Sequence, residues 1–225
     1  MPLHDPAPLP ADTPLPATEE PLSGSAERRL RVLDPGKVRG VLLHFHAGGL
    51  TMGAPAMADA SNSLLARTCG IATASLDYRL APQHPHPRAV DDGEAAALWL
   101  LRHAPGRFGT DRLLIGGDSA GAWLAAQTLL RLRERHGVAD RFRAAYFAVG
   151  CFDMSMTPSQ RASTAAMFLS PERLKDTRTA AFPGLDGELL RDPSISPLYA
   201  PLGGLPPAIF SVGTDDAVLD DSLFM

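Results

Sequence analysis

Hydrophobic and polar positions divide the chain into short apolar runs separated by longer amphipathic segments. Arg28–Leu33 alternates charged and apolar residues, which predicts a partly exposed strand, and the turn residues Asp34-Pro35-Gly36 follow it. The remaining strand candidates are mainly apolar, as in buried parallel strands, and cover Val41–His44, Ile71–Leu76, Arg112–Ile115, Ala144–Val149 and Ala208–Val212. The amphipathic segments predict helices over Pro55–Cys69, over Arg88–His103 and from Ser119 to just before Gly137.

This alternation of strands and helices predicts an α/β fold with a mostly parallel sheet and helices on both faces. The exception is the segment at about 151–205, which is polar, marked by proline and without a clear strand, and has a short helical piece around Pro171–Ala181. We expect this insertion to form part of a lid. Residues 1–27 are rich in proline and predict a flexible arm, so that residues 28–225 form one domain.

Composition and charge exclude several classes of protein. The net charge of -4 and the lack of a basic stripe give no reason to expect a nucleic-acid partner. No apolar run approaches the roughly 18 residues of a membrane span, and the N-terminus lacks the basic and apolar regions of a secretory signal. Cys69 and Cys151 are far apart and in apolar settings, so we expect two reduced core thiols and a cytoplasmic location.

The most informative motif is Gly117-Asp118-Ser119-Ala120-Gly121, which places G-x-S-x-G between a predicted strand and a predicted helix. A serine on such a tight turn is pushed outward at the carboxyl edge of the sheet, and the two glycines leave room for the turn. The helix N-terminus adds positive partial charge and free N–H groups. The motif therefore predicts a nucleophilic Ser119. The alternative is that Ser119 only caps its helix.

A second loop supplies candidate partners for this serine. His46-Ala47-Gly48-Gly49 follows the Val41–His44 strand directly, and adjacent glycines let backbone N–H groups approach a substrate oxygen. Losing one such oxyanion donor costs roughly 3–4 kcal/mol of transition-state stabilisation. We assign the oxyanion hole to the N–H groups of Gly48, Gly49 and Ala120. His46 is interpreted as a residue that shapes the loop, and the alternative for the whole loop is a plain glycine turn.

Five motifs in consistent order resemble the hormone-sensitive-lipase-like esterases of the α/β-hydrolase family. Besides the two motifs above, they are the segments 77–87, 196–200 and 205–216. The resemblance implies an α/β-hydrolase fold, no cofactor or metal, and cleavage of short acyl esters of small alcohols. Ala47 departs from the usual HisGlyGlyGly signature, and Gln83 stands where the family often has Glu. The short segment before the first core strand implies a partial, more open cap.

The resemblance also implies an acidic partner for the base. In this fold the order along the chain is Ser, then Asp or Glu, then His. Matching to the family places the acid at Asp216, in the loop after Ala208–Val212, and Asp215 is the fallback. The alternative is that Asp215, Asp216, Asp220 and Asp221 are all solvated carboxylates at a helix start.

No histidine follows Asp216, since all seven lie earlier in the chain. We expect that the chain is a C-terminally truncated fragment that lacks the last strand and helix. The alternatives are a natural product of a shortened reading frame with little activity, and a substitute base at His84 or His86. Without a base, Ser119 is a weakly nucleophilic hydroxyl.

These observations predict a serine carboxylesterase that forms an acyl-Ser119 intermediate on a small-molecule ester and is inactive or impaired as this chain. A non-catalytic small-molecule-binding protein on a hydrolase scaffold is the alternative, and a peptidase or lactonase is a third. A sheet edge left unpaired and apolar invites self-association.

Overall fold

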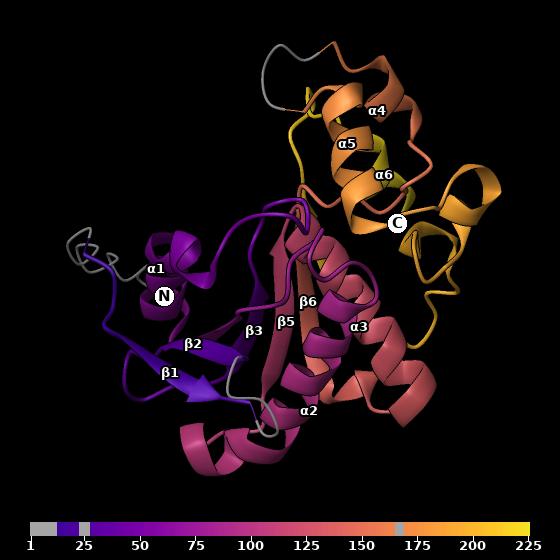
Figure 1. Ribbon diagram of the computed structural model, residues 1–225. Coiled ribbons are helices and arrows are strands. Elements are labelled where there is room, and N and C mark those ends of the chain that lie inside the picture. The colour runs from indigo at the N-terminus through magenta and orange to yellow at the C-terminus, as the bar shows by residue number, and fades with distance from the viewer. Residues whose placement is uncertain (1–12, 23–27, 165–168) are drawn as a thin grey trace, which may run out of the picture.

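The computed structural model describes residues 13–22, 28–164 and 169–225 and is built around one seven-stranded sheet (Figure 1). The strands are β1 (Ala17–Pro21), β2 (Arg29–Leu33), β3 (Val41–Phe45), β4 (Ala72–Leu76), β5 (Leu113–Asp118), β6 (Phe142–Ala148) and β7 (Ala208–Ser211). Their order in the sheet is β1-β2-β4-β3-β5-β6-β7. The pairs β1–β2 and β2–β4 are antiparallel, and the others are parallel. The prediction of a mostly parallel α/β sheet is confirmed.

Helices cover the sheet and gather at one of its ends. They are α1 (Asp59–Cys69), α2 (Arg88–Phe108), α3 (Ala120–His136), α4 (Pro158–Ala162), α5 (Pro171–Ala181) and α6 (Leu219–Phe224). The short 3-10 turns are η1 (Pro55–Ala58), η2 (Ala139–Arg141), η3 (Gly187–Arg191) and η4 (Pro197–Tyr199). Gly137 ends α3 with a φ of 64°, as the sequence predicts. Over the described ranges, none of the helices combines the length and the apolar character that crossing a bilayer requires.

The order of the strands decides which face each long helix covers. The connection through α1 runs from β3 to β4, whereas the connections through α2 and α3 run in the opposite direction across the sheet. Because such crossovers are right-handed, α1 lies on one face, and α2 and α3 lie side by side on the other (Figure 1). The strands between these layers are buried along their whole length in β3 and β4. The centre of the sheet is therefore a rigid support for the loops at its carboxyl edge.

The structure departs from the expected flexible arm at residues 17–21, which form the edge strand β1. Glu19 pairs with Arg31 at 3.2 Å, and Glu20 pairs with Arg107 at 2.8 Å. Pro21 ends the strand, a position where its missing N–H removes no essential sheet hydrogen bond. Proline content hides this short strand in the sequence. The rest of the expected arm, residues 1–12 and 23–27, lies outside the described residues.

Helix α2 is also longer than predicted, because it continues past His103 to Phe108 with Pro105 inside it. Ala104 and Phe108 are buried in the core, and their packing holds the last turn in place.

The segment 151–205 lies at the carboxyl end of the sheet, and no strand occurs in its described residues (Figure 1). It contains α4, α5, η3 and η4, with α5 over the residues expected to be helical. Two side chains of α3 fasten it to the sheet layer: Trp123 Nε1 donates to the Ile195 carbonyl at 2.8 Å, and Gln127 Nε2 donates to the Pro193 carbonyl at 2.9 Å. The insertion is therefore attached directly behind the turn that carries Ser119.

Candidate active site

Ser119 lies between β5 and α3 in a strained backbone conformation, with φ 55° and ψ −118°. A non-glycine residue in such a region costs of order 1–3 kcal/mol and is held there by its surroundings. Here the Ser119 N–H donates to the Ala148 carbonyl at 2.8 Å, and its carbonyl accepts from the Ala122 N–H at 3.0 Å. The hydroxyl makes no capping bond to the helix. Ser119 therefore occupies the N-cap position of α3, but its side chain does not cap the helix.

The two motif glycines are required by the backbone around the turn. A Cβ on Gly121 would lie 2.6 Å from the Phe45 carbonyl carbon and 2.7 Å from the His46 oxygen. A Cβ on Gly117 would lie 2.7 Å from the Gly121 carbonyl carbon. These neighbours are backbone atoms at the end of β3 and the start of α3, so they cannot rotate away. The glycines allow strand and helix to approach closely enough for the sharp turn at Ser119.

The loop after β3 lines the same cavity as Ser119. Gly48 has a φ of 133°, and its carbonyl accepts from the N–H groups of Thr51 at 3.1 Å and Met52 at 3.0 Å. Neither the Gly48 N–H nor the Gly49 N–H donates to any described residue. The Ala120 N–H opens α3, where the first N–H groups have no partner within the helix. These three backbone N–H groups thus have no hydrogen-bond partner among the described residues.

His46 is buried, and its contacts are with its own loop and with Tyr78. Its Nδ1 lies 2.7 Å from the Ala47 carbonyl, and its ring stacks on Tyr78 with 4.2 Å between centroids. The Tyr78 hydroxyl donates to the His46 carbonyl at 2.8 Å. Burial lowers the pKa of His46, which favours the neutral ring. These contacts agree with the loop-shaping role expected from the sequence.

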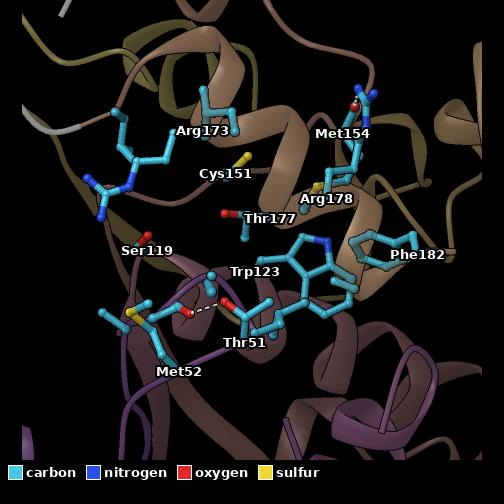
Figure 2. A pocket seen from close by; sticks show the side chains of 18 of the residues that line it. Thr51, Met52, Ser119, Trp123, Cys151, Met154, Arg173, Thr177, Arg178 and Phe182 are labelled. Carbon is cyan, nitrogen blue, oxygen red and sulfur yellow. Dashed lines mark hydrogen bonds between the residues drawn. The ribbon is translucent and has the colours of Figure 1, made fainter. Parts of the chain in front are cut away.

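Ser119 and the three candidate donors line one cavity of about 260 Å³ (Figure 2). Most of the other side chains around it are apolar and come from the loop after β3, from α3 and from α5: Leu50, Met52, Met57, Trp123, Met154, Leu169, Leu174, Ala181 and Phe182. Thr177 of α5 packs directly against the loop: a Cβ added to Gly49 would collide with the Thr177 Cγ2. Helix α5 therefore roofs the cavity above Ser119. Among the described residues, neither a histidine nor a carboxylate lines it.

The acidic segment from the loop after β7 into α6 contains two different kinds of carboxylate. Asp215 is exposed, and Asp216 is half-buried, with its Oδ1 accepting from the Val218 N–H at 3.0 Å. Asp221 is fully buried, so the expectation of a solvated carboxylate is wrong for this residue. It accepts from the N–H groups of Phe152 at 2.6 Å and Asp153 at 2.9 Å, and from the side chains of Thr157 and Gln160. Burial raises the pKa of Asp221, and these hydrogen bonds oppose the rise.

The two histidines considered as substitute bases lie outside this cavity. His84 is exposed, and His86 packs against Trp123 and Phe182, with ring centroids 6.1 and 5.3 Å away. These two rings line the cavity and His86 does not. Burial, followed by the charge of Arg131, lowers the pKa of His86 to about 4. His4 lies outside the described residues.

Comparison with known proteins agrees with this geometry. The alpha/beta hydrolase fold family matches residues 42–225. The carboxylic ester hydrolase LipN of Mycobacterium tuberculosis is 34% identical over 190 residues, which cover 80% of this chain and 50% of LipN. A solved hormone-sensitive lipase from a metagenome library is 30% identical, with a TM-score of 0.82 over 96% of this chain and 72% of its own. The chain belongs to the hormone-sensitive-lipase-like esterases of the α/β-hydrolase family.

A third relative is similar over most of this chain, but the chain is shorter than its curated relatives. Carboxylesterase NlhH of Mycobacterium tuberculosis is 30% identical over 205 residues, covering 88% of this chain and 64% of NlhH. This chain thus spans between half and just under two thirds of the length of these curated relatives. The resemblance inferred from the five motifs is confirmed.

Behind the Ser119 turn lies a polar cluster that sequence reasoning missed. His44, fully buried in β3, has its Nε2 3.2 Å from Asp118 Oδ2 and its Nδ1 3.1 Å from the Ser75 hydroxyl. Asn62 of α1 donates to the same hydroxyl at 3.0 Å. Alternation within β3 could have placed His44 inside the sheet, but its partners come from three separate elements. Asp118 is therefore held from the side of the sheet, immediately before Ser119.

Proposed function

We propose that Ser119 is the nucleophile of a carboxylic-ester hydrolase. The Ser119 oxygen bonds to the ester carbonyl carbon, and the carbonyl oxygen takes the negative charge facing the N–H groups of Gly48, Gly49 and Ala120. Collapse of this intermediate breaks the bond to the alcohol, which leaves with a proton, and water then releases the acid from acyl-Ser119. The supporting observation is the strained Ser119 turn in one cavity with three available N–H donors.

Asp216 is our candidate for the acid that orients the catalytic histidine, and Asp215 is the fallback. The described residues around the cavity supply no histidine. Because the base is missing there, we expect these residues alone to be inactive or strongly impaired. Removal of a triad member lowers kcat by roughly 10⁴–10⁶-fold in a well-studied serine protease.

The size of the cavity supports small ester substrates. Its volume of about 260 Å³ lies below the roughly 300–1,000 Å³ of pockets that hold drug-sized ligands. Thr177 and Leu174 of α5 close it from above. A short acyl chain fits this space better than a long one, and the insertion at 151–205 acts as the lid.

Two further expectations belong to this proposal. The outer edge of β7 has no partner strand among the described residues, and Ile209 on it is 72% exposed. Leu223 and Phe224 of α6 are also exposed. We expect a second copy of the chain to pair at this edge, which light scattering would detect as a dimer that Ile209→Lys disrupts. A cytoplasmic location without a nucleic-acid partner remains a prediction.

Rescue by imidazole tests the proposed chemistry on this chain. Hydrolysis of p-nitrophenyl butyrate is measured with increasing imidazole, which can enter the cavity and act as the absent base. We expect little turnover without imidazole and a saturable increase with it, after subtraction of the Ser119→Ala rate. Ser194→Ala, an exposed serine, is the matched control and should keep the increase. An equal increase in Ser119→Ala would overturn the proposal, and ligand binding without any rescue would favour a binding protein.

A further inference from the structure

Two positively charged side chains line the apolar cavity of Ser119. Two arginines of α5, Arg173 and Arg178, line the cavity among its apolar side chains. The Arg178 guanidinium donates to the Met154 carbonyl at 3.1 Å and forms no ion pair within 4 Å with a described residue. Figure 2 shows Arg178 reaching toward Met154, whereas Arg173 points away from it. A charged group in such a setting calls for an anionic partner.

Arg178 also lines a second hollow of about 410 Å³, so this side chain borders both hollows. Arg161 and Lys175 line the second hollow as well, together with Ser155. Among the described residues, neither Arg161 nor Lys175 has a carboxylate within ion-pair distance. Three cationic side chains thus line one hollow in a chain whose net charge is −4.

The carboxylates in this neighbourhood are already engaged. Asp153 accepts from the Ser155 hydroxyl at 2.6 Å and from the Tyr199 hydroxyl at 3.0 Å. Glu188 pairs with Arg191 at 3.2 Å, and Asp221 is satisfied by its four donors. Glu172 and Asp176 of α5 line neither hollow. The electrostatic field in the second hollow therefore favours an anion.

We propose that the esters bound at Ser119 carry a negatively charged carboxylate on the part of the molecule that extends beneath α5. The apolar cavity holds the reacting ester and its short chain. Arg178, with Arg161 and Lys175, binds the terminal carboxylate in the second hollow. The substrate class is then the half-esters of dicarboxylic acids. This inference deepens the proposed function, since the reacting ester group would lie at Ser119.

Matched ligands test this specificity by binding, without any need for turnover. Monobutyl succinate carries one carboxylate, and butyl methyl succinate is its neutral counterpart. Binding to the 225-residue chain is measured by calorimetry in a Ser119→Ala background. We expect the half-ester to bind about 10-fold more tightly than the diester at low salt, since a charge-assisted bidentate contact is among the stronger hydrogen bonds. High salt should reduce the difference.

Variants of the cluster assign the effect to its residues. Arg178→Gln should remove most of the preference, and Arg178→Lys should keep part of it. Lys175→Gln, which removes no side-chain hydrogen bond to a described residue, should reduce the preference about 2- to 5-fold, as for an exposed charge pair. Arg102→Gln, an exposed cation on α2, is the control and should change nothing.

Three results would overturn the inference. The diester could bind as tightly as the half-ester, or the cluster variants could weaken both ligands equally. Inorganic phosphate could also bind the hollow without displacing the half-ester, which would make it an anion site unrelated to the substrate. None of these results bears on Ser119 chemistry, which is judged separately by imidazole-dependent turnover of the neutral p-nitrophenyl ester.

Discussion

Replacing Gly121 by alanine tests whether the close approach of β3 and α3 determines the fold of the nucleophile turn. The added Cβ would lie less than 3.0 Å from three backbone atoms of Phe45 and His46. Overpacking of this kind costs about 1–3 kcal/mol, and the upper end applies because backbone atoms cannot rotate away. Alanine in a helix recovers about 1 kcal/mol relative to glycine. The free energy of unfolding should therefore fall by about 2 kcal/mol.

Urea denaturation followed by tryptophan fluorescence measures this change. With a slope of about 2 kcal/mol per molar urea, the midpoint should fall by about 1 M. Gly106→Ala is the matched control, because Gly106 lies in α2 and its added Cβ would meet nothing within 4 Å. That variant should be unchanged or more stable by up to about 1 kcal/mol. If Gly121→Ala unfolds at the same urea concentration as Gly106→Ala, the argument for a sterically required glycine fails.

Three further predictions follow from buried groups. Asp221→Ala leaves four donors without an acceptor, so the free energy of unfolding in urea should fall by about 3–5 kcal/mol. Asp215→Ala, at an exposed carboxylate, should change it by no more than about 0.5 kcal/mol. Equal effects of the two substitutions would contradict the anchoring role of Asp221. The pKa of His86 falls from 6.5 to about 4 in the folded chain, so the unfolded chain binds more protons between these values and stability should rise with pH there. His86→Gln should flatten the rise in urea midpoint between pH 5 and pH 7.5. An unchanged slope in this variant would refute the prediction. Cys69 is exposed and is therefore not the core thiol that the sequence predicts, whereas burial raises the pKa of the Cys151 thiol. Ellman's reagent should modify Cys69 first, and the opposite order in single-cysteine variants would be inconsistent with the structure.

The features that could be predicted from the sequence are those in which neighbouring residues determine the geometry. The Ser119 turn is one example, because the strand, the two glycines and the helix are contiguous. The α5 helix is another, since Ser170 accepts from the Arg173 N–H and Pro171 occupies the first turn. In both cases local sterics and local hydrogen bonds are sufficient to specify the conformation.

Features that depend on distant partners could not be predicted in the same way. The residues next to Asp221 do not distinguish it from a solvated carboxylate at a helix start. Its hydrogen-bond donors lie 61–69 residues earlier in the chain. The His44 cluster draws on residues of α1, β4 and β5. The β1 strand is concealed by proline and becomes stable only through β2 and through its ion pairs with Arg31 and Arg107. Tertiary contacts decide each of these, and no local pattern reports them.

The central claim is that the Ser119 hydroxyl faces the N–H groups of Gly48, Gly49 and Ala120 and reacts with an acyl carbon. The most direct measurement is the reaction of the chain with a fluorophosphonate probe in the presence of imidazole, followed by peptide mapping of the modified residue. The account predicts one adduct, on Ser119, that is absent from Ser119→Ala. Modification of another residue at the same rate, or labelling that survives Ser119→Ala, would contradict it.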